Sequence, residues 1–305
     1  MRVTNKSLHK SIVSQLNDVS SAMVAANRVV SSGRKINRLS DDPVGLVSVL
    51  NLRSSLSNLE QLERNLGVGR SWLEAGESAL SQVENLLSEA RALCVQMCSA
   101  NIGAEQRSNA VAVVDGYLQQ TLALANTEVG GRYLFGGTRT DVPPFLLSGS
   151  EEVTYQGNDT PFSIKIGKSM DLTVGRDGES IFGDCDINWA DPAAGQDNLF
   201  KTLMDLKDHL RLNDAESVRA TLTRLDRHLD TVRAAVSDTG ARRLRLETKG
   251  AVIQDLKLAY TERKSRIEDC DIAEAIMNLK SKELAYQASL ASSSRVMQLT
   301  LMDYL

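Results

Sequence analysis

Both ends of the chain carry long apolar heptad patterns, and neither end has a complementary segment nearby in the sequence. Near the start, apolar residues recur at alternating spacings of four and three: Ile12, Leu16, Val19, Met23, Ala26 and Val30. Near the end, one heptad frame holds Ile272, Ile276, Leu279, Tyr286, Leu290 and Met297. Such a repeat places an apolar seam along one side of a helix, as in a coiled coil. Because an isolated helix is marginal in water, each terminal helix must be completed by the other end or by other copies of the chain.

The middle of the chain has a different composition from its flanks. Residues 130–198 contain more than half of the chain's 20 glycines. Short alternating runs at 152–155, 162–166 and 172–174 are separated by glycine-containing breaks, which predicts a hairpin between the first and second runs and another between the second and third. The flanks keep apolar heptads: Leu73, Gly76, Leu80, Val83, Leu87, Ala90, Cys94 and Met97 before the middle, and Val218, Leu222, Leu225, Leu229, Val232 and Val236 after it.

These patterns predict a mainly α fold with a β-rich insertion. The fold would be an antiparallel helical bundle or coiled coil made from both chain ends, with a small β domain at its tip. Since the chain turns round once, its two ends should lie together. The expected domains are an N-terminal assembly helix (1–42), the N-terminal part of the bundle (43–129), the β-rich exposed insertion (130–198), the C-terminal part of the bundle (199–267) and a C-terminal assembly helix (268–305).

Two helix starts have recognisable capping residues. Asp42 followed by Pro43 is typical of an N-cap and first helical position, where the carboxylate accepts free backbone N–H groups and proline loses nothing. Asp271, with Glu274 three residues later, is similar to a capping box. The sequence is equally compatible with one uninterrupted helix through 268–274.

Charge and hydropathy exclude several classes of function. A net charge of −4 and a pI of about 5.6 argue against bulk nucleic-acid binding. No apolar run approaches the roughly 18 residues that would span a membrane. Ser7, Ser11, Ser14 and Gln15 interrupt any apolar core of a secretory signal peptide, so an exported chain would need a route without a cleaved signal.

Residues that could bind a metal or take part in catalysis are present, but they do not form a recognisable site. Cys94 and Cys98 lie one helical turn apart and would offer two metal ligands, but Cys94 occupies an apolar heptad position, which favours a core role. The three histidines, His9, His209 and His228, are scattered. The carboxylates of the candidate helix starts are explained by capping and helix dipoles. We therefore expect no enzyme activity, cofactor or metal site.

Two short runs of opposite charge stand where the terminal helices should meet the central bundle. The basic run is Arg28, Arg34, Lys35 and Arg38, and the acidic run is Glu268, Asp269, Asp271 and Glu274. If the chain folds back on itself, the two runs fall at the same level and can dock within one subunit or between neighbours. The alternative is that the basic run is a solvated loop.

Two motifs together resemble the signature of the flagellin superfamily. Residues 31–46 read SSGRKINRLSDDPVGL, and residues 265–274 read SRIEDCDIAE, with Cys270 where the family usually has alanine. In the middle, 131–138, 144–145, 155–159 and 181–183 are similar to the junction-forming members of that superfamily. The resemblance covers both helical arms.

The resemblance implies a non-enzymatic structural subunit of the extracellular bacterial flagellum. It would be exported through the type III apparatus and polymerise at the hook–filament junction. Its partners would be copies of itself, the first junction protein on the hook side, flagellin on the filament side and an export chaperone binding the C-terminal helix. A major filament flagellin is the main alternative, followed by a cytoplasmic coiled-coil scaffold. In either flagellar case the heptad residues at both ends would form the assembly interface.

Overall fold

The computed structural model describes residues 5–99, 101–148, 152–185 and 197–302, with all their side chains except those of 5, 6, 8 and 296–302. The helices are α1 (Asn5–Ser32), α2 (Pro43–Met97), α3 (Ala104–Ala125), α4 (Glu179–Phe182), α5 (Leu199–Arg211), α6 (Ala215–Glu268) and α7 (Ile272–Met302). The strands are β1 (Glu128–Val129), β2 (Arg132–Tyr133), β3 (Phe145–Leu147), β4 (Val153–Tyr155), β5 (Ser163–Lys165) and β6 (Asp171–Thr173). The expected mainly α fold with a small β region is confirmed.

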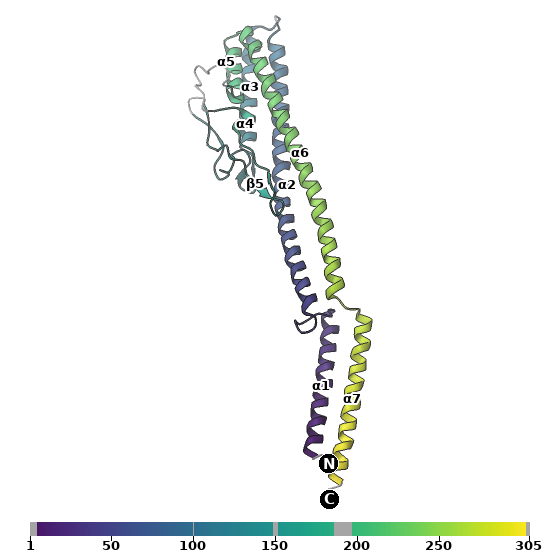
Figure 1. The fold of residues 1–305 in the computed structure, drawn as a ribbon. Coiled ribbons are helices and arrows are strands. Elements are labelled where there is room, and N and C mark those ends of the chain that lie inside the picture. Colours follow the sequence, from purple (N-terminus) through teal and green to yellow (C-terminus); the bar gives the residue numbers. More distant parts are fainter. Residues whose placement is uncertain (1–4, 100, 149–151, 186–196, 303–305) are drawn as a thin grey trace. The chain divides into compact units, whose positions relative to one another are not determined.

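The chain divides into two compact units. The first combines Met1–Leu59 with Gln254–Leu305, and the second is Glu60–Ile253. Helices α2 and α6 each contribute residues to both units. In the first unit, α1 and α7 pack against each other and run in opposite directions (Figure 1). The two terminal heptad helices therefore pair with each other, which is one of the two completions that the sequence predicted.

Both long helical paths of the first unit break at the same level. Gly33 ends α1 with a φ of 68°, which glycine adopts without strain, and its N–H donates to Val29 O at 2.9 Å. The backbone N–H of Lys35 donates to Glu268 O at 2.8 Å, and that of Cys270 donates to Gly33 O at 3.0 Å. These two bonds join the loop after α1 to the break between α6 and α7. We call this connection the joint.

Asp42 and Asp271 cap the helices as expected, although no bond from the Glu274 side chain back to Asp271 is seen among the described residues. Helix α2 begins at Pro43, and Asp42 Oδ1 accepts the Gly45 N–H at 2.9 Å. Helix α6 ends at Glu268, and Asp271 Oδ1 accepts the Ala273 N–H at 2.8 Å, which caps α7. An uninterrupted helix through 268–274 is therefore wrong. Backbone N–H groups of two loop residues, 37 and 38, donate to Asp41 and lower the pKa of its carboxyl.

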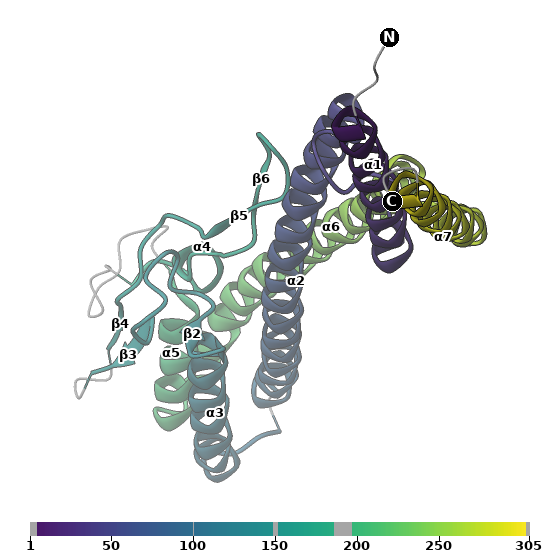
Figure 2. The same cartoon turned by 90° about the horizontal axis from the view of Figure 1, so that it is seen from below.

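The second unit is built on an antiparallel pairing of α2 and α6. Its heptad positions are in the core, with Leu80 and Leu87 1% exposed and Leu225 and Val232 0% exposed. Ion pairs link the two helices at successive levels: Arg91–Asp226 at 2.5 Å, Arg233–Glu84 at 2.9 Å and Arg243–Glu77 at 3.4 Å. Helices α3 and α5 pack on each other in the same unit. Figure 2 shows the strands and α4 gathered on one side of α2.

The described strands form three two-stranded antiparallel pairs. Gly130 and Gly131, with φ values of 59° and 76°, make the tight turn between β1 and β2. The predicted hairpin between the runs 162–166 and 172–174 is confirmed, because β5 pairs with β6. The predicted pairing of 152–155 with 162–166 is wrong, because β4 pairs with β3. The segment between the runs 152–155 and 162–166 contacts the loop after β2 instead, where Asn158 Oδ1 accepts the Thr138 N–H at 2.8 Å.

Aromatic side chains form the core of this β region. Phe182 packs on Phe135, Phe145 and Phe200 with ring centroids 5.5, 5.2 and 5.7 Å away. All four rings are at most 2% exposed. Phe135 is therefore a core residue of the β region. We call these four rings the phenylalanine cluster.

Candidate assembly surfaces

The seam predicted on α1 lies on the less exposed side of that helix. Ala26 is buried at 8% exposure, and the remaining five predicted positions are half-buried: Ile12, Leu16, Val19, Met23 and Val30. On α7, the predicted residues Leu279 and Tyr286 are half-buried as well. These residues belong to the two helices that pack on each other in the first unit.

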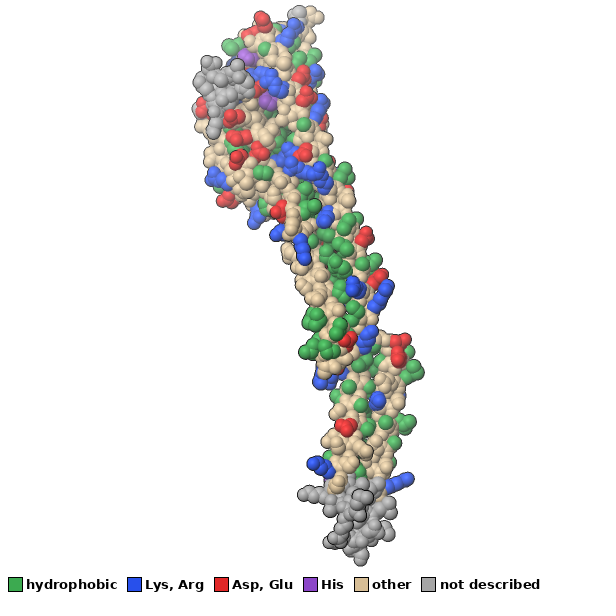
Figure 3. Space-filling model, viewed as in Figure 1, with side chains coloured by type: hydrophobic (Ala, Val, Ile, Leu, Met, Phe, Trp, Pro, Cys, Tyr) green, Lys and Arg blue, Asp and Glu red, His purple; other side chains and the backbone are tan. Residues whose placement is uncertain are grey.

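The rest of the predicted seam on α7 is uncovered. Ile272, Ile276 and Leu290 are 55%, 44% and 44% exposed. The side chain of Met297 lies outside the described residues. Two further apolar residues of α7, Met277 and Leu284, are 66% and 68% exposed. Figure 3 shows hydrophobic side chains at the surface along this pair of helices. We call Ile272, Ile276, Met277, Leu284 and Leu290 the open face of α7.

The open face exists because α7 turns a largely polar side inward. Its less exposed positions are Ala275, Leu279, Lys282, Glu283, Tyr286, Ser289 and Ser293. Four of these seven are lysine, glutamate or serine, so pairing with α1 buries only part of the apolar surface of α7. Full burial of an aliphatic side chain contributes about 1.5–3 kcal/mol of favourable free energy. The residues of the open face would obtain this contribution only if a partner covered them. Its role as an assembly interface stays a prediction.

Glu268 is the electrostatic centre of the joint. Its side chain is 2% exposed, and Oε1 forms an ion pair with Arg34 Nε at 3.0 Å and accepts a hydrogen bond from Arg53 Nη2 at 2.5 Å. Oε2 has no hydrogen-bond partner among the described atoms. Both arginines are nearly half exposed, so only the carboxylate has lost its water. We call Arg34, Arg53 and Glu268 the clamp; sequence reasoning missed Arg53, which lies outside the basic run.

The other charged residues proposed for docking have different surroundings. Lys35 Nζ donates to the backbone oxygen of Arg266 at 2.9 Å, and Asp269 accepts from the hydroxyl of Ser265 at 2.6 Å. Asp271 is the cap of α7. Arg28 and Arg38 lie near Asp41, and Glu274 is exposed. The structure therefore brings Arg34 to Glu268 within one chain, while docking between subunits stays a prediction.

A buried polar cluster in the second unit was not anticipated. Asp197 accepts from Arg224 at 2.6 Å, lies 3.3 Å from His228 Nε2, and receives the Thr202 hydroxyl at 3.0 Å. Burial alone would raise the pKa of Asp197, but hydrogen bonds from His228 and Arg224 outweigh burial and hold that pKa well below its usual value.

This cluster does not have the geometry of a catalytic triad. Thr202 Oγ1 lies 3.1 Å from the same Nε2 atom of His228 that faces Asp197. In a triad the nucleophile and the carboxylate contact different ring nitrogens of the histidine. One nitrogen accepts the proton of the nucleophile, while the carboxylate orients the ring through the other nitrogen. The cluster instead fastens the start of α5 to α6. The one hint of this cluster in the sequence is that polar residues, Arg224 and His228, lie between the apolar heptad positions of α6.

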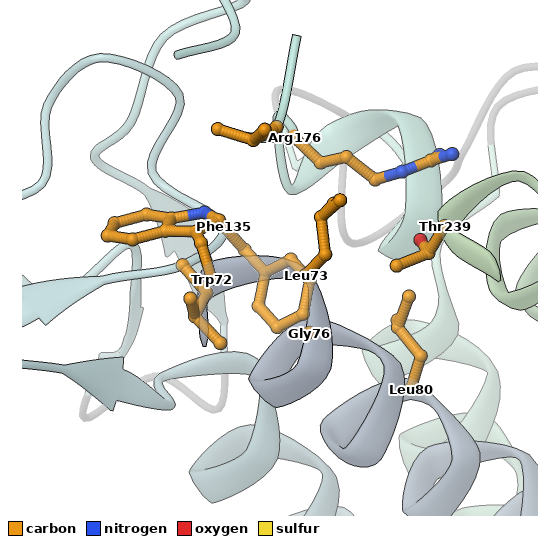
Figure 4. A pocket seen from close by; sticks show the side chains of 9 residues that line it. Trp72, Leu73, Gly76, Leu80, Phe135, Arg176 and Thr239 are labelled. Atoms are coloured by element: carbon orange, nitrogen blue, oxygen red, sulfur yellow. The ribbon is translucent and has the colours of Figure 1, made fainter. Parts of the chain in front are cut away.

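One small cavity of the second unit, between α2, α6 and the β region, has no room for a substrate. It holds about 10 Å³, roughly the space of one water molecule. Figure 4 shows Trp72 and Phe135 on one side of it and Thr239 on another, with Gly76 of α2 beneath. The cavity is a packing gap between helices and the β region rather than a reaction site.

The cysteines behave as core or surface residues. Cys94 is 0% exposed, and burial raises the pKa of its thiol to about 12. Within the described ranges, no group of three or more histidine, cysteine or acidic side chains is placed to hold a metal ion. No described helix is both long and apolar enough to cross a lipid bilayer.

Family models match both helical arms of the chain. The bacterial flagellin N-terminal helical region matches residues 3–140, and the bacterial flagellin C-terminal helical region matches residues 222–305.

Curated relatives extend the similarity through the middle of the chain. Flagellar hook-associated protein 3 of Escherichia coli (strain K12) is 27% identical over 276 residues, covering 85% of this chain and 86% of that protein. Its namesake in Salmonella typhimurium is 24% identical and covers 95% of both chains. A flagellin of Bacillus subtilis is 25% identical over 98% of this chain and 97% of its own.

Solved structures show the same fold. The hook-associated protein 3 of Legionella pneumophila has a TM-score of 0.62, is 18% identical, and covers 72% of this chain and 99% of its own. FlgL of Bacillus cereus has a TM-score of 0.58 and is 23% identical, covering 69% of this chain and 97% of its own.

Proposed function

Because the chain belongs to the flagellin family, we propose that it polymerises at the hook–filament junction and connects the hook-side junction protein to the flagellin filament. It is a structural component of the bacterial flagellum and not an enzyme, as its relatives are structural flagellar proteins. The finer assignment to the junction is supported by similarity to two hook-associated proteins over most of both chains.

The open face of α7 is the observation that supports polymerisation. Its five apolar residues are 44–68% exposed in the single chain. A soluble monomer rarely keeps a contiguous apolar surface unless it serves as an interaction site. Burial against terminal helices of neighbouring subunits, including hook-side and filament-side proteins, would supply the missing packing.

The same face suits an export partner. Before assembly, a chaperone with an apolar groove would cover α7 and keep the chain from premature association. We propose export through the type III apparatus without a cleaved signal peptide. The assembled location would be the extracellular flagellum.

Cryo-electron microscopy of the isolated hook–filament junction tests the assignment. Density for this chain should appear as a thin zone between hook and filament, and cells without the chain should keep hooks while shedding monomeric flagellin. Subunits found along the whole filament would instead support a major filament flagellin, which the similarity to the Bacillus subtilis flagellin makes the second candidate. Stoichiometry separates the two, since a junction needs few copies.

A further inference from the structure

A second apolar surface of this chain is a groove beside the β5–β6 hairpin. The hairpin is fixed to α2 by Asn65 Nδ2, which donates to Lys165 O at 2.9 Å, and to α6 by Arg242 Nη1, which donates to Thr173 O at 3.0 Å. Next to it is an open hollow of about 610 Å³, large enough for several side chains. We call it the hairpin groove; its lining is Ile166, Met170, Asp171, Leu172, Leu244, Arg245, Thr248, Lys249 and Val252.

The groove combines uncovered apolar side chains with free positive charge. Met170, Leu244 and Val252 are 54%, 60% and 44% exposed. Arg245 and Lys249, one helical turn apart, have no ion-pair partner among the described residues, whereas six other arginines of α6 have one. Asp171 is the single acidic residue of the lining. An occupant should therefore be apolar and acidic.

The start of α2 combines exposed apolar side chains with acidic residues. At the start of α2, Leu39, Val44, Val47 and Leu50 are 62%, 78%, 55% and 53% exposed. Between residues 39 and 50 the only charged residues are acidic, Asp41 and Asp42. We call residues 39–50 the helix-start patch. Figure 3 shows hydrophobic side chains clustered at the surface where α2 begins.

The dimensions of patch and groove agree. Val44, Val47 and Leu50 lie three residues apart, so they occupy an arc of about 120° on α2 and a length of about 9 Å. The groove follows α6 from Leu244 to Val252, which is about 12 Å of helix. A stripe of that length fits the groove, and the carboxylates at its start can approach Arg245 or Lys249.

We propose that the helix-start patch of one copy docks in the hairpin groove of a second copy. The proposal rests on the proposed function, since it requires that copies assemble. Patch and groove are different surfaces, so the contact is head-to-tail and each bound copy still offers a free patch or a free groove. Such a contact extends a polymer instead of closing a dimer. The open face of α7 would unite the terminal helices, and this second contact would join the bodies of neighbouring subunits.

Cysteine cross-linking between assembled copies tests the contact. One copy carries Val47→Cys and another carries Leu244→Cys, both with Cys98→Ser and Cys270→Ser to remove the less buried native thiols. The two are produced together in cells lacking the natural chain, and the isolated flagella are treated with a short bismaleimide. The matched control pairs Val47→Cys with Leu212→Cys, which is 75% exposed but outside the groove.

The expected result is a mixed dimer at least about tenfold more abundant than in the control pair, because docking raises the local thiol concentration. A chain that carries both Val47→Cys and Leu244→Cys should give a ladder of multimers, as a head-to-tail contact requires. The pair Val44→Cys and Val252→Cys provides the same measurement if the first pair assembles poorly.

Three results would overturn the proposal. The first is a yield no higher than in the control pair in flagella that assemble normally. The second is a cross-link from Leu244→Cys to a different flagellar protein, identified by mass spectrometry. The third is dimers without a ladder from the doubly substituted chain. Failure of the proposed function is distinguishable, because the natural chain would then be absent from the junction in flagella isolated from unmodified cells.

Discussion

Removing the two arginines of the clamp should loosen the joint more than removing its glutamate. In the Arg34→Met/Arg53→Met double variant, the carboxylate of Glu268, 2% exposed, loses both cations that pair with it. Leaving a buried charge without its partner costs about 3–5 kcal/mol. In Glu268→Gln, the arginines, 47% and 43% exposed, return to water and a neutral amide replaces the charge. The loss should then be about 1–2 kcal/mol, near that of a hydrogen bond to a charged group.

Amide hydrogen exchange measures the difference between the stability losses of the two variants at the joint itself. The N–H groups of Lys35 and Cys270 are donated to Glu268 O and Gly33 O, so their protection reports whether the joint is closed. A loss of 3–5 kcal/mol corresponds to exchange faster by about a hundredfold to a few thousandfold, because each 1.4 kcal/mol is a factor of ten. Glu268→Gln should accelerate the same amides by roughly five- to thirtyfold.

The matched control is Arg91→Met in the second unit. Arg91 and Asp226 are 45% and 44% exposed, and such a surface pair contributes about 0–1 kcal/mol. It should leave the amides of the joint unchanged. The reasoning is refuted if Glu268→Gln accelerates exchange at Lys35 and Cys270 as much as the double arginine variant does.

Three further predictions concern the open face, α2 and the β region. Leu290→Asp should prevent incorporation into flagella while leaving the far-UV circular dichroism of the monomer unchanged, since this position is 44% exposed until assembly buries it; flagella containing the variant would contradict this. Gly76→Ala should raise the free energy of unfolding in urea by about 1 kcal/mol, because no atom lies within 4 Å of the added Cβ and alanine favours a helix. Gly69→Ala should lower it, because the new Cβ would lie 2.3 Å from Ile164 Cδ1, and equal effects of the two substitutions would refute the packing argument. Burial raises the pKa of Tyr155 to about 12, so this phenol should ionise last in an ultraviolet titration. Its ionisation is disfavoured in the folded state, so stability from this group is complete below pH 10 and is lost as the pH rises towards 12; Tyr155→Phe should weaken that loss.

The sequence was sufficient for the helices because their signals are local. Heptad spacing identified the buried positions of α2, and Asp42 with Pro43 marked its first turn. The same reasoning could not choose between a continuous helix and a break at 268–274. That choice depends on the backbone of Gly33 and Lys35, which lie more than 200 residues away.

The β region and the clamp were harder to predict because distant residues determine them. The strand at 153–155 pairs with β3 because Asn126 holds Phe145, accepting its N–H at 2.9 Å and donating to its carbonyl at 2.8 Å. No turn motif in the sequence reports that contact. Arg53 was missed for a similar reason. Nothing in the sequence around an exposed arginine on a long helix indicates which residue it pairs with, and its partner Glu268 is far away in the sequence.

The phenylalanine cluster has a consequence for the order of folding. Its rings come from four separate segments, and Phe135 and Phe200 are 65 positions apart (200 minus 135). Helical turns form from neighbours in sequence, whereas this core forms only after several loops have closed, each at an entropic cost. A chain that emerges unfolded would therefore gain its helices first and complete its β region last. The speed at which a new subunit matures would be set by the part of the molecule with the fewest local contacts, far in sequence from the heptads at its two ends.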